Sequence, residues 1–466
     1  MSHRERRFVR ACDGTLVADG LGRRRTSGLL LVSRGAMADI RPLRTLRYEP
    51  TVVGPLDRVV APPYDVIDAE ERAELMARSP YSVVAVDLPQ REGSDTDEYE
   101  TAGKIFERWE REGALVREQE PALWGHTQEY TGPDGVARTR RGFFCAVRIE
   151  EYGPGRVRPH ERTHPGPKED RLRLTRATRT NLSPIFSLYS DPQQSAWAAL
   201  SPFTEGEPWA QARDADGTVH RLWRVADEEA IAAAQAAASA SELLIADGHH
   251  RYETAQTYAR ETDAANPHAA PDAPHHFVLM CLVALEDPGL TVFATHRLVG
   301  GLDEARRAAL RETLERDFEA EEVPVTALAE IERGSEGVLE LGFIDASDRR
   351  ALRLRLRDQA IADGALPGHS EAYRHLDTGV LEALVLKGPL GLSEGDISHL
   401  NGLGYARSVS DALALLDSGA YEAAFIMRPT PVEQVKDVAE AGENMPPKST
   451  YFFPKVLTGL LFNPLD

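Results

Sequence analysis

The chain has 466 residues, 42% of them hydrophobic, which predicts large buried cores spread over roughly two to four domains. Its formal net charge of −20 argues against a protein whose main work is to neutralise nucleic-acid phosphates, because such binding needs clustered Lys and Arg. The cysteines, Cys12, Cys145 and Cys281, lie too far apart for a disulfide framework or a CxxC metal site, and no apolar run is long enough to span a membrane. We therefore expect a protein of the reducing cytoplasm.

Residues 1–36 differ in composition from the rest of the chain. They contain eight arginines against three acidic residues and show no sustained periodicity, whereas "MADIRPLRTLRYEP" from Met37 is typical of the start of a globular protein. We expect either a start codon assigned too early or a disordered leader. A basic arm that binds nucleic acid is the alternative.

Helix and strand signals alternate through the first half of the chain. Asp68 and Glu71 have the spacing of a capping box, and the apolar run at 81–89 predicts a buried strand. Apolar residues recur every three or four positions in 97–112, which predicts an amphipathic helix closed by Gly113. Strand-like runs follow at 121–131 and 140–152, and the Gly-Pro-Asp-Gly sequence between them is typical of a hairpin.

The second half continues the alternation. We expect a helix over the alanine-rich stretch 228–240, a strand at "ELLIA" and a fully buried strand at 277–286. A charged helix is predicted at 302–319, then a strand pair at "VLELGFI" and "ALRLRLR", then a helix with a cap formed by Thr430, Pro431 and Glu433. Mixed strands and helices predict an α/β or α+β fold.

The strand-to-helix corner "LLIADGHHRYETA" gathers an acid, a glycine, two histidines and an arginine between Asp247 and Arg251. The free N–H groups of the first helical turn, together with the helix dipole, would form an anion site there. Gly248 lets the backbone approach a phosphate, and Arg251 can grip two oxygens. An ordinary Asp–Gly turn with surface histidines is the alternative.

Two features of this corner need separate explanations. Asp247 would be repelled by a phosphate unless it holds a metal ion, takes a proton or orients a histidine. The adjacent His249 and His250 could donate hydrogen bonds to a phosphate. A transition metal held by both is disfavoured, since adjacent residues of a helix point about 100° apart.

Residues 158–191 concentrate polar side chains in a segment broken by Pro and Gly. We expect a long functional loop rather than a packing element, because loops of this length in compact domains are usually functional or disordered. A merely solvated loop is the alternative. The candidate residues in it are His160, Glu161, His164, Lys168, Asp170, Arg171 and Asn181.

Three shorter stretches supply further candidates. "RVVAPPYDVID" leaves an apolar run through two prolines, and the alternative is a turn in which Asp65 is a local cap. "MPPKSTYFFPK" combines Lys, Ser and Thr, which suits phosphate binding, with aromatics that suit a terminal segment docked on the core. "FATHRLV" ends a strand with a polar pair that could be structural. The residues concerned are Tyr64, Asp65, His296, Arg297, Lys448, Ser449, Thr450 and Lys455.

These motifs carry a resemblance. "IADGHHRYETA" resembles the phosphate-binding signature of the ParB/sulfiredoxin superfamily, in which a strand leads to a Gly-X-X-Arg turn and a helix that cradles nucleotide phosphates. With "APPYDVI", "HERTHPGPKEDRLRL", "LSPIFSLYSD", "THRLV" and "MPPKSTYFFPK", the chain from about Met37 to Asp466 resembles an uncharacterised bacterial ParB-like family often found beside serine-biosynthesis genes. The wider group includes free-serine kinases that use ADP or pyrophosphate, so the resemblance implies a phosphotransferase.

The resemblance also implies an organisation in which Gly248, His249, His250 and Arg251 form the phosphate signature. We expect a ParB/sulfiredoxin-like core at residues 226–300, an N-terminal α/β region at 37–225 that includes the 158–191 loop, and a C-terminal α/β domain at 301–466 that includes "MPPKST".

The leading functional hypothesis is transfer of a phosphoryl group from ATP, ADP or pyrophosphate to a small hydroxy amino acid, assisted by Mg²⁺. Cationic side chains would neutralise the phosphates, and one acid would take the hydroxyl proton. The candidates for charge neutralisation are Arg251, Lys168, Arg171 and Lys448; those for proton transfer are Asp247, Glu161 and Asp65, with His160 as a further catalytic candidate. The oligomeric state stays open.

Other functional classes remain as alternatives. A nucleotide-binding DNA-segregation protein is opposed by the acidic composition and by a buried strand where a basic recognition helix would be needed. A non-catalytic metabolite-binding protein would need the phosphate contacts but no proton acceptor. Phosphoester hydrolysis is a further possibility. Sulfiredoxin-like reduction is disfavoured because the signature lacks a cysteine.

Overall fold

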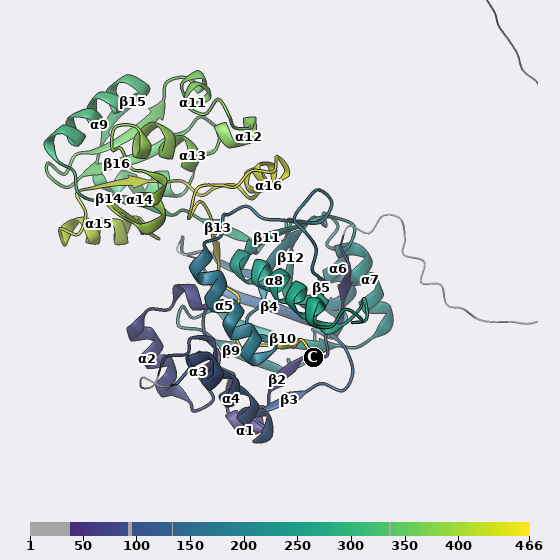
Figure 1. Ribbon diagram of the computed structural model, residues 1–466. Helices are drawn as coiled ribbons and strands as arrows, with labels where there is room; N and C mark the ends of the chain where they lie inside the picture. The colour runs from purple at the N-terminus through teal and green to yellow at the C-terminus, as the bar shows by residue number, and fades with distance from the viewer. Residues whose placement is uncertain (1–37, 92–95, 133, 335–336) are drawn as a thin grey trace, which may run out of the picture. The chain divides into compact units, whose positions relative to one another are not determined.

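The structure is a computed structural model that describes residues 38–466, apart from residues 92–95, 133 and 335–336. The expectations for residues 1–36 therefore lie outside the described residues. Helices and strands are mixed along the chain, which confirms the α/β class (Figure 1). In the part of the chain that the structure describes, no helix combines the length and apolar character needed to cross a membrane.

A nine-stranded sheet organises much of the chain before residue 285. Most of its neighbouring strands are antiparallel, and the β12–β8 and β11–β6 pairs are parallel. The predicted hairpin and both predicted strands near residues 243 and 277 are confirmed. In spatial order the strands are β6 (Val157–Arg158), β11 (Leu243–Asp247), β8 (Ile185–Tyr189), β12 (Phe277–Ala284), β5 (Ala137–Arg148), β4 (Leu123–Thr131), β10 (Val219–Val225) and β9 (Ala210–Arg213), with β1 (Ile40–Arg41) on β5.

Both faces of this sheet are buried because helices cover them. Alternate residues of β12 enter different cores: Val278, Met280 and Leu282 pack in one, whereas Leu279 and Cys281 pack in the other. The helices of this part are α1 (Pro50–Val53), α2 (Ala69–Arg78), α3 (Val84–Asp87), α4 (Glu98–Arg111), α5 (Pro165–Thr178), α6 (Ser195–Leu200), α7 (Glu228–Ala238) and α8 (His249–Ala265).

A six-stranded antiparallel sheet follows, and it contains the predicted pair around residues 340 and 354. Its strands are, in spatial order, β15 (Phe318–Val323), β17 (Ala351–Leu356), β16 (Glu340–Asp345), β19 (Ala423–Ile426), β14 (His296–Val299) and β18 (Leu403–Ala406). The associated helices are α9 (Glu304–Asp317), α10 (Leu328–Glu332), α11 (Gln359–Ala365), α12 (Glu371–Arg374), α13 (Asp377–Leu381), α14 (Glu394–His399), α15 (Val409–Asp417) and α16 (Val432–Glu440).

The last residues of the chain return to the part that contains the nine-stranded sheet. β20 (Tyr451–Phe453) pairs with β13 (Thr291–Phe293), and β21 (Asn463–Pro464) pairs with β7 (Thr180–Asn181). Phe462 is fully buried and stacks edge-on against Tyr48. The segment from Tyr451 onward is therefore part of that core, while the predicted domain boundaries at residues 225 and 300 stay a prediction.

Several sequence predictions of single elements are confirmed. The amphipathic helix is α4, whose inward residues are buried, and Gly113 after it has φ +73°. The alanine-rich helix is α7 and the charged helix is α9. Asp68 caps α2 through the N–H groups of Glu70 and Glu71.

Three element predictions are wrong. The apolar run at 81–89 forms helix α3, because a short buried run carries no period that separates strand from helix. The 158–191 segment contains the fourteen-residue helix α5 and the buried strand β8. Pro165 and Pro167 stand in the first turn of α5, where no backbone N–H is needed. Thr430 does not cap α16, since its hydroxyl donates to the Ser449 carbonyl instead.

Candidate functional site

A cavity of about 500 Å³ lies at the N-terminus of α8. Segments that are far apart in the sequence line it, and together they bring in four cationic side chains and three carboxylates. Among the sequence-predicted site residues, it gathers Tyr64, Asp65, Glu161, Asp247, Gly248, His249, His250, Arg251, Lys448, Thr450 and Lys455.

The corner between β11 and α8 presents backbone N–H groups to this cavity. A register irregularity between Ile245 and Asp247 ends the regular strand, and Gly248 then adopts φ +102°, a conformation that side-chain-bearing residues rarely take. No side chain caps the helix, whose first internal backbone bond runs from Tyr252 to Gly248. Among the residues that the structure describes, the N–H groups of residues 249–251 have no partner, so they could bind an anion, with the positive end of the helix dipole behind them.

Asp247 is held between two cations. One carboxylate oxygen pairs with the Lys455 ammonium and the other with the Arg251 guanidinium. Burial alone would raise the pKa of the Asp247 carboxyl, but the charges of Lys455 and Arg251 outweigh burial and hold the pKa well below its usual range. Asp247 is therefore an ionised organiser of two basic side chains.

Arg251 is engaged on several sides. Its guanidinium donates to the Ser183 hydroxyl at 2.8 Å, to the Pro184 carbonyl and to Asp247. It also lies against Gly248, where an added Cβ would come within 3.1–3.2 Å of guanidinium atoms. The side chain that sequence analysis assigned to phosphate gripping is thus fixed in place by protein partners.

Glu161 differs from Asp247 in its surroundings. Among the described residues, its carboxylate makes no hydrogen bond or ion pair, although it lines the same cavity. Burial raises the pKa of the Glu161 carboxyl, and the charge of Asp247 adds to this, while the Lys448 and Lys455 charges oppose it. A carboxylate with a raised pKa and no partner is suited to accept a proton.

His160 and His249 make hydrogen bonds that hold the corner between β11 and α8 in place. His160 is buried, and its Nδ1 lies 2.7 Å from the Ile245 carbonyl, so Nδ1 must donate; Nε2 then accepts from the Thr450 hydroxyl at 3.0 Å. Burial lowers the pKa of His160 to about 4, which keeps it neutral. The His160 backbone N–H donates to His249 Nε2 at 3.3 Å. These bonds tie the 158–164 segment, the corner and the C-terminal segment together.

Lys448 and Arg407 add positive charge that has no carboxylate partner among the described residues. Lys448 is exposed and adopts φ +56°. The Arg407 guanidinium lies 5.0 Å from the centre of the Tyr451 ring, on which the Lys455 ammonium also rests at 5.7 Å. Sequence analysis missed Arg407, because nothing in "GLGYARS" distinguishes it from a surface arginine.

A buried pair on the nine-stranded sheet positions the backbone beside Lys455. Arg140 on β5 donates to Gln128 on the facing position of β4 and to the Phe453 carbonyl, and Gln128 donates to the Lys455 carbonyl at 2.9 Å. Burial lowers the pKa of Arg140 to about 10. Sequence analysis missed both residues, although a charged residue inside an apolar strand was a signal.

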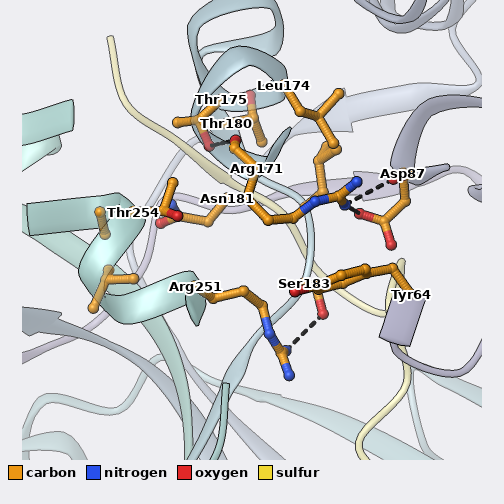
Figure 2. A pocket seen from close by; sticks show the side chains of 13 residues that line it. Tyr64, Asp87, Arg171, Leu174, Thr175, Thr180, Asn181, Ser183, Arg251 and Thr254 are labelled. Carbon is orange, nitrogen blue, oxygen red and sulfur yellow. Dashed lines mark hydrogen bonds and ion pairs between the residues drawn. The ribbon is translucent and has the colours of Figure 1, made fainter. Parts of the chain in front are cut away.

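A second, small pocket of about 40 Å³ shares Tyr64 and Arg251 with the first, and Figure 2 shows the side chains that line it. Arg171 donates to the buried Asp87 carboxylate at 3.0 Å, pairs with Asp170 and lies 4.2 Å from the centre of the Tyr64 ring. Burial raises the pKa of Asp87, and Arg171 opposes this. Arg171 is therefore bound within the protein and does not line the larger cavity.

Other predicted site residues have local partners away from the larger cavity. Lys168 pairs with Glu253 at 2.8 Å, and the Asn181 carbonyl accepts from the Leu279 N–H. His296 accepts from the Met427 N–H. The Ser449 hydroxyl donates to the Pro446 carbonyl, and Arg297 donates to the Pro447 carbonyl; both thereby support the loop that carries Lys448.

The fold and the cavity together define an α/β protein in which one cavity joins an uncapped helix N-terminus to a carboxylate that has no partner among the described residues. The family described as "Protein of unknown function (DUF1015)" matches residues 40–378, and the chain belongs to this family. No curated protein matches it.

Solved structures show distant similarity. A conserved hypothetical protein from Pyrococcus furiosus is 15% identical, with 64% of this chain and 87% of that chain covered and a TM-score of 0.32. A free serine kinase in complex with AMP is 16% identical, with 64% and 83% covered and a TM-score of 0.32. SbnI with a C-terminal truncation, from Staphylococcus aureus, is 11% identical, with 68% and 85% covered and a TM-score of 0.33. Function is inferred below from the side chains of the site.

Proposed function

We propose that this protein is a small-molecule phosphotransferase that moves a phosphoryl group from a nucleotide or pyrophosphate to the hydroxyl of a small amino acid such as L-serine. The observation that carries the proposal is the pairing, in one cavity, of an uncapped helix N-terminus with a carboxylate that has no partner and a raised pKa. The resemblance of "ADGHHRYETA" to the ParB/sulfiredoxin phosphate signature supports the same assignment.

The donor phosphates would lie at the start of α8. Three backbone N–H groups and the helix dipole face the cavity there, and Lys448, Arg407 and the Lys455–Asp247–Arg251 cluster surround it. Fixed cations and dipoles stabilise the charge that spreads over the transferring group, which is the main contribution of a protein to phosphoryl transfer.

Glu161 would accept the proton of the acceptor hydroxyl. As the hydroxyl oxygen forms its bond to phosphorus, the bond from phosphorus to the leaving oxygen of the donor breaks, and the proton passes to Glu161. The leaving group is AMP from ADP, ADP from ATP, or phosphate from pyrophosphate. Asp247 is the weaker candidate for this role, because the two cations that hold it lower its basicity.

Magnesium fits the cavity through Asp65. This exposed carboxylate lines the cavity, and among the described residues it makes no hydrogen bond or ion pair. Mg²⁺ is usually held by one or two carboxylates plus substrate phosphates. When bound, the ion would neutralise phosphate charge, while this chain's own residues bind the donor and take the proton.

A non-catalytic nucleotide-binding protein is the second candidate. The observation that favours it is that Arg251 and Lys455, two of the cations nearest the corner, are already paired with Asp247. Such a protein would hold the donor at the helix N-terminus without using Glu161.

A donor and acceptor screen separates the candidates. Purified protein is incubated with Mg²⁺, one of ATP, ADP or pyrophosphate, and L-serine, L-threonine or L-homoserine, and phosphorylated amino acid is detected by mass spectrometry. The proposal predicts O-phospho-amino acid with at least one donor. Donor binding without product in either direction would support the binding protein instead.

A further inference from the structure

Asp263, His275 and His276 form a compact cluster at the other end of α8. Their ligand atoms all lie within 4.8 Å of one another. Both His275 Nε2 and His276 Nε2 lie 2.9 Å from Asp263 Oδ1, and the two imidazole rings are 4.2 Å apart. Two nitrogens and one carboxylate oxygen, contributed by two elements, thus converge on one point.

The contacts of His276 call for a cation at this point. Its Nδ1 lies 3.2 Å from the Pro271 carbonyl, which can only accept, so Nδ1 carries a proton. In the neutral ring Nε2 is then a lone pair, yet it faces both oxygens of the Asp263 carboxylate at 2.9 and 3.1 Å. With Nδ1 as the donor, a metal ion between Nε2 and the carboxylate would satisfy both acceptors. A backbone carbonyl that holds the other nitrogen of a ligating histidine is a common supporting contact.

The position of the cluster favours a metal ion over a proton. Asp263 stands in the last turn of α8, where the negative end of the helix dipole disfavours a carboxylate and favours a cation. A single dication would satisfy both imidazole nitrogens at once, whereas without it both Nε2 atoms share one oxygen of Asp263, each at 2.9 Å. A cavity of about 300 Å³, lined by His276 and Asp263 together with Arg260 and Glu151, gives access from solvent.

We propose that Asp263, His275 and His276 bind a zinc-class transition-metal ion, with the fourth coordination position open to water. Imidazole nitrogens with one carboxylate suit Zn²⁺ rather than Mg²⁺. Fourteen residues separate this cluster from the start of α8, about 21 Å along a helix, so the ion would not take part in phosphoryl transfer. It would clamp the end of α8 to the turn that precedes β12.

The test uses the full-length protein freed of metal with a chelator. Zn²⁺ is titrated by calorimetry, Co²⁺ by its visible absorption, and melting temperatures are recorded with and without Zn²⁺. We expect one ion per chain, four-coordinate Co²⁺ bands and a higher melting temperature with Zn²⁺. Loss of a residue that only supports a metal ligand costs roughly 10- to 100-fold in metal affinity. The double variant His275→Gln/His276→Gln loses two ligands and should bind Zn²⁺ more weakly by at least that factor.

His268→Gln is the matched control, because His268 is an exposed histidine of the same connecting segment and lies outside the cluster. It should bind Zn²⁺ as the wild type does. If the double variant does not fold in chelator, Asp263→Asn replaces it, since this change keeps the side-chain size and removes one ligand. The proposal would be overturned if the wild type does not bind one Zn²⁺ per chain. It would also be overturned if the variant without the cluster binds Zn²⁺ as tightly as the wild type.

Discussion

At the scale of single residues, three carboxylates share one cavity and have different surroundings. Asp247 is ionised and held between Lys455 and Arg251. Glu161 has a raised pKa and no partner among the described residues, and Asp65 is exposed. Acids of one site that have different surroundings can take different roles in its chemistry. We accordingly infer that Asp247 positions the two basic side chains, Glu161 accepts the proton and Asp65 holds the metal ion.

Glu161→Gln should lower turnover by roughly 100-fold or more with donor affinity little changed, because the amide keeps the size of the side chain but removes its basicity. Since burial raises the pKa of Glu161, the wild-type rate should begin to fall, as pH decreases, at a pH above the value of about 4.3 for ordinary glutamate. Steady-state rates across pH measure both effects.

Glu169→Gln is the control for this change. Glu169 is exposed on α5 and does not line the cavity, so its amide variant should keep the wild-type rate and pH profile. Near-normal turnover in Glu161→Gln would remove Glu161 from the proposed chemistry.

Asp247→Asn should destabilise the fold by about 3–5 kcal/mol, because it leaves two largely buried cations without a counter-charge. The folded-state pKa of Asp247 lies below its unfolded value of about 3.9, so this stabilisation is fully present above that value and is lost as pH falls toward the folded pKa. Urea unfolding of the wild type and the variant, measured from pH 7 down into the acid range, checks both the loss of stability and its dependence on pH.

Asp65→Asn provides the comparison, since an exposed carboxylate without partners should change stability by no more than about 0.5 kcal/mol. If Asp247→Asn unfolds at the wild-type urea concentration and with the wild-type dependence on pH, the ion-pair description of the corner is wrong.

At the scale of elements, the start of α8 depends on Gly248. An alanine there would adopt a disfavoured left-handed conformation, at a cost of about 1–2 kcal/mol, and would press on the Arg251 guanidinium. Displacing Arg251 should weaken donor binding roughly 10- to 150-fold, the equivalent of a lost charged hydrogen bond of about 1.5–3 kcal/mol. Calorimetric donor titration and thermal melts of Gly248→Ala measure the two effects.

Gly113→Ala isolates the backbone part of this change. Gly113 also has positive φ, but an added Cβ there meets nothing within 4 Å. We expect it to lose similar stability and to bind the donor normally. Donor binding reduced equally in both variants, or in neither, would contradict the assignment of the phosphate site to the α8 corner.

The strand pair β4–β5 should position Lys455 through Arg140. Arg140→Met leaves Gln128 and the Phe453 carbonyl without their donor, at about 1–3 kcal/mol for each unsatisfied group, and should also slow turnover. Arg138→Met, two residues away on the same strand, removes a pair with Asp134 and a hydrogen bond to the Val136 carbonyl, both within the exposed hairpin, and should cost less than about 1 kcal/mol. Equal loss of stability and rate in the two variants would refute a positioning role for Arg140.

Periodicity predicted the long elements, and local chemistry decided the exceptions. The α4 helix follows from apolar residues that recur every three or four positions, whereas strand β12 was predicted from the length and composition of a continuous apolar run, which has no period of its own. α3 was misread because a four-residue element is too short to show a period, and α5 because Pro165 and Pro167 suggest a loop unless they fall in a first turn.

The position of the candidate site could be predicted in part. The position of the α8 corner was predicted from a strand that runs through a glycine into a helix. Such an order is sufficient to place the unpaired N–H groups of a first helical turn beside the end of a strand. Lys448 and Lys455 were also singled out in the sequence and line the cavity, whereas Arg407 was not, because it arrives from a segment more than 150 residues away and no local pattern marks it. Lys168 and Arg171 looked equally suitable in the sequence, yet Glu253 and Asp87 hold them.

At the scale of the whole molecule, the site requires distant parts of one chain. Tyr64, Glu161, Asp247, Arg407 and Lys455 line a single cavity. The C-terminal segment that carries Lys455 also fills a core, where Phe462 is fully buried. The chain's net charge is −20, whereas the cavity contains more cations than carboxylates. An anionic donor is therefore attracted to the cavity more strongly than to the rest of the surface.

The central claim is that α8 holds a phosphate donor beside Glu161. It is tested most directly by a crystal structure of the protein with Mg²⁺, pyrophosphate and L-serine. We predict a phosphate oxygen within about 2.7–3.2 Å of the backbone N–H groups of His249–Arg251. The serine hydroxyl should lie within about 2.6–3.2 Å of a Glu161 oxygen, the distance that proton transfer requires. Pyrophosphate bound elsewhere, or a serine hydroxyl directed away from Glu161, would contradict the account.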